Sequence, residues 1–175
     1  MHVIFRESHT LDDTDAPFDI NQTAAELIVL SFSDSDLGAF LAGWHRAKNI
    51  PDNGSIPTLR LVNLIALKHP LSVDTYIEKT ASHAKGILIR LIGGKNYWNY
   101  GLMQLQDIAR KKDIALAVIP GDGREDPQLD ELSTVPTSTL RRLKTLCDYG
   151  GEVAAQAALA QLSVAAGVYF KPVIG

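Results

Sequence analysis

Residues 86–102, GILIRLIGGKNYWNYGL, hold the pattern that decides the fold. The apolar run over 86–92 is typical of a strand buried on both faces, as strands of parallel sheets are. Two glycines follow it, and the next stretch predicts a helix that ends near Lys112, with Asn96 as its cap. A strand that passes through a glycine turn into a helix is the building unit of an α/β domain.

The rest of the chain repeats this unit. Apolar runs predict further strands at 2–5, 26–32, 58–67 (with a short helix at its end) and 115–120. Helical periodicity predicts helices at 35–48, 72–83, 127–133, 137–148 and 151–167. We therefore predict an α/β fold of the flavodoxin-like, doubly wound type, with a mostly parallel sheet, flanking helices and a helical C-terminal segment. Residues 1–135 are expected to form the α/β domain and 136–175 a helical extension.

Composition excludes several classes of function. The net charge of −3 and the absence of a Lys/Arg run argue against nucleic acid and anionic membranes as partners. No apolar run of about 18 residues and no signal peptide are visible, so a cytoplasmic location is expected. Cys147 is the one cysteine, and it is interpreted as a small buried hydrophobe; no Cys/His pattern predicts a metal site.

The aromatic stretch admits two interpretations. Gly93 and Gly94 permit positive φ or a close approach of backbone to a ligand. The rings of Tyr97, Trp98 and Tyr100 suit a flat, partly apolar ligand, and the start of a helix favours carboxylates on it. In the alternative interpretation Trp98 packs under the sheet edge and the tyrosines cap the helix.

Other polar residues fall on the loops that follow the strands, where ligands of open parallel sheets bind. His69 is either a metal ligand or base, or a hydrogen-bonded structural residue before the Pro70 turn. Arg90 lies inside a strand and requires a partner if buried, for which Asp74 and Asp122 are the predicted candidates. The phosphate-binding patterns GxxxxGK[ST] and GxGxxG and the esterase pattern GxSxG are absent, which disfavours an independent small enzyme or sensor.

Two long motifs carry a resemblance to a known family. KHPLSVDTYIE at 68–78 and RLIGGKNYWNYG at 90–101 lie between ELIVLSFSDSDL at 26–37 and ALAVIPGDGREDPQLDELSTVP at 115–136. The two motifs lie within a longer matching segment, 59–105, and all these segments run in the family order. They resemble the N-terminal portion of CobN, the large subunit of aerobic ATP-dependent cobaltochelatase, within the magnesium chelatase large-subunit family.

The resemblance implies a function. Subunits of this family bind the corrin hydrogenobyrinic acid a,c-diamide, and two smaller subunits form an ATPase complex that drives cobalt(II) insertion in cobalamin biosynthesis. Family members are several-fold longer, so we expect a fragment that is inactive alone, binds no cofactor of its own and packs on the remainder of the subunit. The whole complex would use cobalt(II) and ATP with Mg²⁺.

No catalytic residue is carried over from the family. The substrate-binding residues that the motifs imply, all expected at the carboxyl edge of the sheet, are His69, Asp74, Arg90, Gly93, Gly94, Tyr97, Trp98, Tyr100 and Asp122. The alternative function is a structural or docking module of the same subunit without a ligand site.

Overall fold

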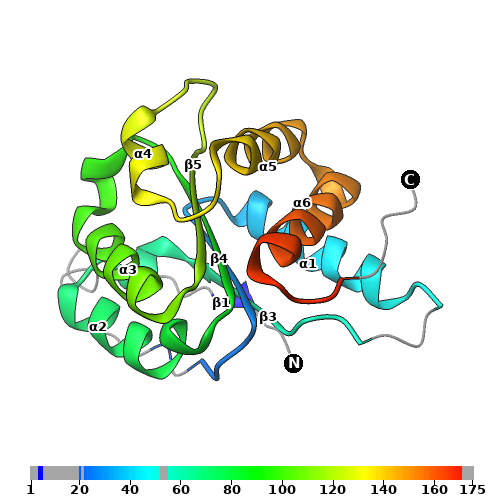
Figure 1. The fold of residues 1–175 in the computed structure, drawn as a ribbon, viewed down its shortest axis with the longest axis horizontal. Coiled ribbons are helices and arrows are strands. Elements are labelled where there is room, and N and C mark those ends of the chain that lie inside the picture. The colour runs from blue at the N-terminus through cyan, green and yellow to red at the C-terminus, as the bar shows by residue number, and fades with distance from the viewer. Residues whose placement is uncertain (1–3, 6–19, 21, 52–54, 171–175) are drawn as a thin grey trace.

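Five parallel strands form one sheet in the order β1-β3-β2-β4-β5 (Figure 1). The computed structural model describes residues 4–5, 20, 22–51 and 55–170. The strands are β1 (Ile4–Phe5), β2 (Leu27–Ser31), β3 (Leu59–Asn63), β4 (Gly86–Leu91) and β5 (Ala115–Pro120). The predicted parallel α/β fold is confirmed. Residues 2 and 3 of the first predicted strand lie outside the described part.

The strands that follow β2 in the chain are added on opposite sides of it. From β2 the chain moves to β3 on one side and then returns past β2 to β4 on the other. Strand order therefore switches between β2 and β4, whose first residues pair as Leu27 with Gly86. The carboxyl ends of such a strand pair leave a crevice in which ligands of doubly wound proteins bind.

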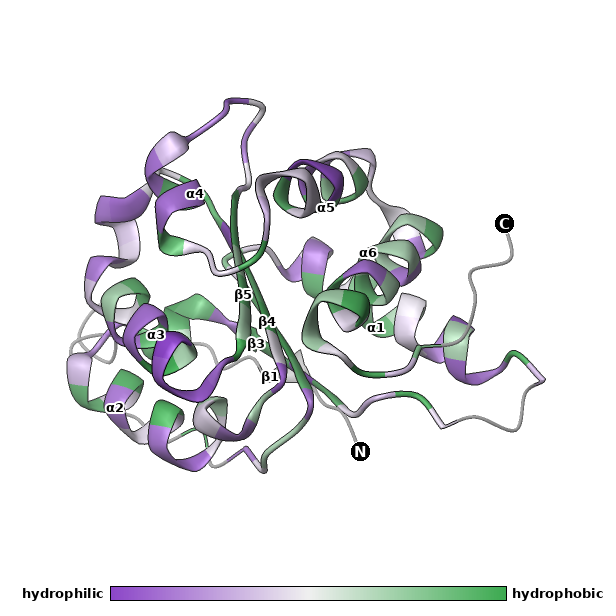
Figure 2. Cartoon of the chain, in the orientation of Figure 1, coloured by the Kyte–Doolittle hydropathy of each residue, from purple (hydrophilic) through white to green (hydrophobic). Residues whose placement is uncertain are grey.

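Two helical layers cover the sheet (Figure 1). One layer holds α2 (Pro70–Lys79), α3 (Asn99–Lys112) and α4 (Pro127–Leu132), and the other holds α1 (Asp34–Lys48), α5 (Thr137–Tyr149) and α6 (Gly151–Ala166). Alternate strand residues face each layer: Ile28 and Leu30 join the first core, while Leu27 and Val29 join the second. This explains why the strands are mainly apolar, and Figure 2 shows mostly hydrophobic colours along them.

Local chemistry explains where the helices begin. Ser33 caps α1 by accepting a hydrogen bond from the Asp36 backbone N–H at 3.2 Å. Helix α2 begins at Pro70 and not at the predicted residue 72, because proline suits the first helical position. Helix α3 begins at Asn99, after the 3₁₀ turn η4 (Lys95–Trp98), so the predicted Asn96 cap is wrong.

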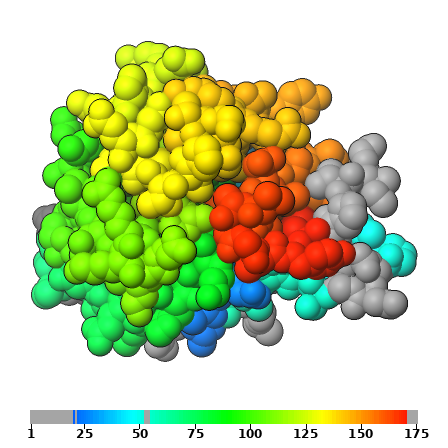
Figure 3. Space-filling view, viewed as in Figure 1, coloured from blue at the N-terminus to red at the C-terminus, as the bar shows by residue number. Residues whose placement is uncertain are grey.

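Residues 137–166 pack on the rest of the described chain. Leu140, Leu143, Leu159 and Leu162 join the core between the sheet and α1. At Gly43 the α1 and α6 backbones approach so closely that a Cβ would lie 2.7 Å from the Gln156 backbone nitrogen. Figure 3 shows the orange and red atoms of the C-terminal helices packed against the yellow and green atoms of the preceding chain. The division at residue 135 as a domain boundary stays a prediction.

The outer edge of β5 is closed by the loop between α4 and α5. Ser133 and Thr134 accept hydrogen bonds from the backbone N–H groups of Val118 and Leu116, at 2.9 and 2.7 Å. The Thr134 backbone N–H donates to the Leu116 carbonyl at 2.8 Å. These contacts occupy backbone groups that could otherwise pair with another strand.

Among the described helices, none is long and apolar enough to cross a membrane.

Candidate functional site

The Gly93–Gly94 turn lies at the carboxyl end of β4, beside the point where strand order switches. Both glycines have positive φ, 91° and 79°, which is one of the two roles that the sequence left open for them. A Cβ on Gly93 would lie 2.6 Å from Cδ2 of Tyr97, so the Tyr97 ring rests directly on the glycine backbone. The turn therefore positions an aromatic side chain as well as redirecting the chain.

Tyr97 is exposed and held in place. Its side chain is 59% exposed, yet its ring meets that of Phe32 edge-on with centroids 5.6 Å apart. Phe32 follows β2 and Tyr97 follows β4, so this pair bridges the switch point. The Lys68 ammonium lies over the Tyr97 ring, 5.9 Å from the ring centroid. The arrangement leaves a fixed aromatic surface open to solvent.

Trp98 occupies the packing position that the alternative interpretation predicted. It is only 5% exposed, and its indole Nε1 donates to the Leu67 carbonyl at 2.8 Å. A Cβ on Gly101 would lie 2.2 Å from the indole, so the glycine makes room for the ring. Trp98 therefore supports the site from below and offers no open ring face.

His69 and Asp74 form local contacts on α2. His69 is the N-cap of the helix: its Nδ1 accepts a hydrogen bond from the Leu71 backbone N–H at 3.1 Å. This matches the structural interpretation of His69. The Tyr100 hydroxyl donates to Asp74 at 2.7 Å, and this hydrogen bond raises the pKa of Tyr100. Tyr100 thus ties the start of α3 to α2.

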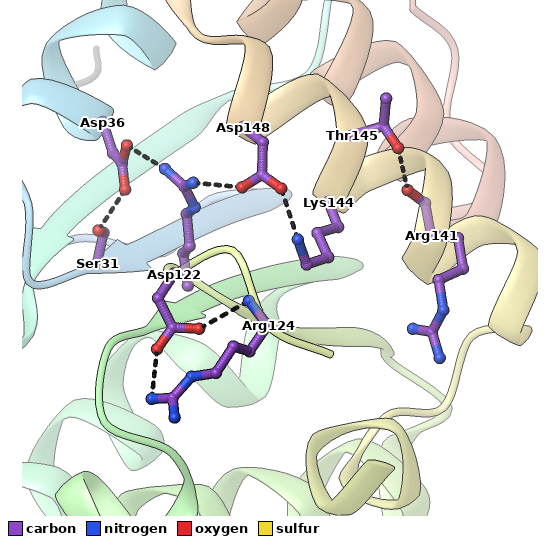
Figure 4. Close-up of polar contacts among 9 residues, drawn as sticks. Ser31, Asp36, Asp122, Arg124, Arg141, Lys144, Thr145 and Asp148 are labelled. Carbon is purple, nitrogen blue, oxygen red and sulfur yellow. Dashed lines mark hydrogen bonds and ion pairs between the residues drawn. The ribbon is translucent and has the colours of Figure 1, made fainter. Parts of the chain in front are cut away.

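Arg90 belongs to a charge network on the opposite face of the sheet. Its guanidinium contacts Asp36 at 2.6 Å and Asp148 at 2.8 Å, so the predicted pairing with Asp74 or Asp122 is wrong. Asp148 also contacts Lys144 at 2.6 Å, and the Ser31 hydroxyl donates to Asp36 at 2.9 Å. Figure 4 shows Asp36 and Asp148 on either side of the shared guanidinium.

The electrostatics of this network are those of a structural clamp. Burial opposes the charge on Arg90, but Asp36 and Asp148 outweigh it and raise the arginine pKa. The three groups come from β4, α1 and α5, which join only through the fold. The error in the predicted partner has a simple cause, because residue 90 points toward the α1 and α5 layer and away from α2 and α3.

Asp122 lies across the Gly93–Gly94 turn from Tyr97. It accepts hydrogen bonds from the backbone and side chain of Arg124, which lower its pKa. A cavity of about 230 Å³ lies here between the glycine turn and the loop after β5. Its charged lining consists of Asp122, Arg124, Glu125 and Asp126. This side of the turn is therefore polar and mainly acidic.

The opposite side of the turn is apolar with a cationic rim. Phe32, Lys68 and Tyr97 follow β2, β3 and β4 and meet in the contacts given above, and we name them the switch-point face. Of these three residues, only Tyr97 was predicted from the sequence. The signal for Phe32 was present, because it is the last apolar residue of the strand run 26–32 and lies beside the switch point. Within the described residues, no group of three His, Cys, Asp or Glu side chains could hold a metal ion.

Known proteins resemble this chain over most of its length. It is 38% identical over 151 residues to the aerobic cobaltochelatase subunit CobN of a Sinorhizobium species, and 37% identical over 151 residues to that of Pseudomonas aeruginosa. Each match covers 86% of this chain but only 11% and 12% of the two relatives. No family model matches.

A solved structure shares the fold. The catalytic subunit of cobaltochelatase from Mycobacterium tuberculosis superposes with a TM-score of 0.59 over 85% of this chain and 11% of that one, at 21% identity. The predicted relationship is confirmed: this chain is related, over most of its length, to one segment of the CobN subunits of aerobic cobaltochelatases.

Proposed function

We propose that this segment presents the switch-point face to the corrin substrate of a CobN-like subunit, hydrogenobyrinic acid a,c-diamide, during ATP-dependent cobalt insertion. The observation that carries the proposal is Tyr97, a ring that is 59% exposed and yet fixed by Phe32 and Gly93. A fixed, exposed ring loses little conformational freedom when a ligand covers it, which favours binding. The macrocycle is flat and largely apolar in its ring, so stacking on Tyr97 suits its chemistry.

The chemical step itself requires more than this segment. The residues of the switch-point face supply apolar and cationic contacts but no set of metal ligands. We place cobalt(II), as a substrate, and the two ATPase subunits with the remainder of the longer subunit. The chain alone should then bind the corrin without inserting cobalt, which the absorption spectrum of the corrin would report after addition of cobalt(II), ATP and Mg²⁺. Appearance of the cobalt corrin spectrum with this chain alone would refute that assignment.

Binding is tested by calorimetric titration of the chain with hydrogenobyrinic acid a,c-diamide. Tyr97→Ala should weaken the affinity, because the variant removes the stacking surface. Tyr149→Ala is the matched control, since Tyr149 is an even more exposed tyrosine (88%) on α5 in the other helical layer. If both variants retain saturable binding with equal affinity, the ligand binds another surface. No binding by the unsubstituted chain would reject the proposed function.

A second candidate is a docking module with no ligand site. It is favoured by Val164 and Val153 on α6, which are 75% and 44% exposed and lie on the same face about three helical turns apart. Exposed apolar side chains that share a face can mark a contact surface. This function predicts that the isolated chain self-associates. Val153→Ser with Val164→Ser should then lower the mass measured by light scattering at high concentration. A monomer before and after the substitutions would count against docking through α6.

A further inference from the structure

The Gly93–Gly94 turn separates an acidic cavity from the switch-point face along the carboxyl edge of the sheet. On the β5 side the cavity is lined by three carboxylates and one guanidinium. On the β2 and β3 side the exposed charged group nearest to Tyr97 is the Lys68 ammonium. Lys95, the first residue of η4, is a half-exposed cation that follows the glycine turn. Carboxylates lie on this side too: Asp74 accepts the Tyr100 hydroxyl, and Asp34 accepts from the Asn63 side chain.

Lys68 is placed to take part in binding. Its Nζ lies 5.9 Å from the Tyr97 ring centroid, at the outer limit of a cation–π contact. Among the described residues neither Lys68 nor Lys95 has a carboxylate within ion-pair distance. The four-carbon stem of lysine lets the ammonium leave the ring at small cost and move to an anion at the rim of a covering ligand. Tyr97 remains in place because Phe32 and Gly93 hold it.

We propose that Lys68 and Tyr97 together select planar ligands with peripheral carboxylates and seat them on the β2 and β3 side of the glycine turn. Tyr97 stacks on the ring of the ligand, and Lys68 moves from Tyr97 to a rim carboxylate. The acidic surface around Asp122, Glu125 and Asp126 repels the same rim and excludes the opposite seating. This inference rests on the proposed function and adds the charge preference and the orientation of the ligand.

The test compares three macrocycles on the same chain by fluorescence and calorimetric titration. They are hydrogenobyrinic acid a,c-diamide, uroporphyrin I as a flat probe with carboxylates at its rim, and a tetra-N-methylpyridylporphyrin as a flat probe with cations at its rim. The two anionic ligands should bind more tightly than the cationic one. Their affinity should fall as salt concentration rises, since exposed charge pairs are screened.

Lys68→Met keeps the length of the side chain and removes its charge. It should weaken both anionic ligands by roughly fivefold, the upper range for an exposed charge pair, and flatten their salt dependence. Tyr97→Phe should bind like the unsubstituted chain, because the ring is retained, and Tyr97→Ala should lose affinity for all three macrocycles. Lys111→Met is the matched control, since Lys111 lies at the far end of α3 and is 68% exposed in its side chain.

The outcomes separate this inference from the proposed function. If the corrin binds and depends on Tyr97, but Lys68→Met changes neither affinity nor salt dependence, the selection by Lys68 is wrong and the proposed function stands. Preference for the cationic porphyrin would likewise overturn the inference and place a ligand on the acidic side. If no macrocycle binds, both the inference and the proposed function fail.

Discussion

Replacement of Gly43 by alanine tests the close crossing of the α1 and α6 backbones. A Cβ at residue 43 would lie 2.7 Å from the Gln156 backbone nitrogen and 2.9 Å from the Glu152 carbonyl oxygen. Both obstacles are backbone atoms of a helix, so no side-chain rotation relieves the clash. Helix α6 must move away from α1, which loosens the core around Leu159 and Leu162.

The magnitude follows from two opposing effects. Alanine in place of glycine in a helix interior gains about 1 kcal/mol, whereas overpacking a core costs about 1–3 kcal/mol. Because the clash is with backbone, we take the upper end of that cost, and Gly43→Ala should destabilise the fold by about 2 kcal/mol. Gly38→Ala on the same helix is the matched control: nothing lies within 4 Å of its Cβ, so it should stabilise by up to about 1 kcal/mol.

Urea unfolding followed by tryptophan fluorescence measures both variants, since Trp44 lies on α1 and Trp98 under the sheet edge. An unchanged slope of the unfolding free energy against urea concentration would show that the variants expose similar surface area on unfolding. The two stabilities can then be compared directly. Equal stabilisation by both alanines would refute the reasoning, because it would mean that α6 does not approach α1 at Gly43.

Three further predictions concern the polar and aromatic contacts. Burial raises the pKa of Cys147 to about 12, so the half-buried native thiol should react with a disulfide reagent at pH 8 more slowly than the thiol of the unfolded chain. Stability should fall as pH rises from about 9, where the unfolded thiol ionises, through about 12. Arg90→Lys should destabilise by about 2 kcal/mol in thermal unfolding, because one ammonium replaces a forked contact to Asp148 and a second carboxylate; an unchanged midpoint would contradict the clamp. Gly101→Ala should displace the Trp98 indole, cost about 1–3 kcal/mol and shift the tryptophan emission, whereas an unchanged spectrum would argue against the close contact.

The sequence predicted the fold well because its signals are local and repeated. Continuous apolar runs, helical periodicity and a serine cap each depend on neighbouring residues, and every strand was expected close to its observed place. The helix starts near Pro70 and Asn99 were less accurate. At α2, His69 is the cap and Pro70 the first helical residue. At α3, the helix follows η4 without a side-chain cap hydrogen bond, so no capping residue marks its start.

The site was predicted less well because its contacts join distant segments. The order of strands decides that Arg90 meets Asp36 and Asp148, which are 54 and 58 residues away, and that Phe32 meets Tyr97. Periodicity fixes which strand residues share a face but not which helix covers that face. A prediction of the strand order β3-β2-β4 would have indicated Phe32, and with it the aromatic pair.

The distribution of roles around the glycine turn bears on function. Trp98, His69 and Arg90 each have a partner inside the fold, and their contacts explain why the chain needs them. Tyr97 differs, because its ring is open to solvent while the turn below it uses a glycine at positive φ. Glycine loses more conformational freedom on folding than other residues, so this support costs stability. The glycine turn lowers stability and fixes an exposed ring at the point where doubly wound sheets bind ligands. This favours a binding role for Tyr97 over a purely structural one.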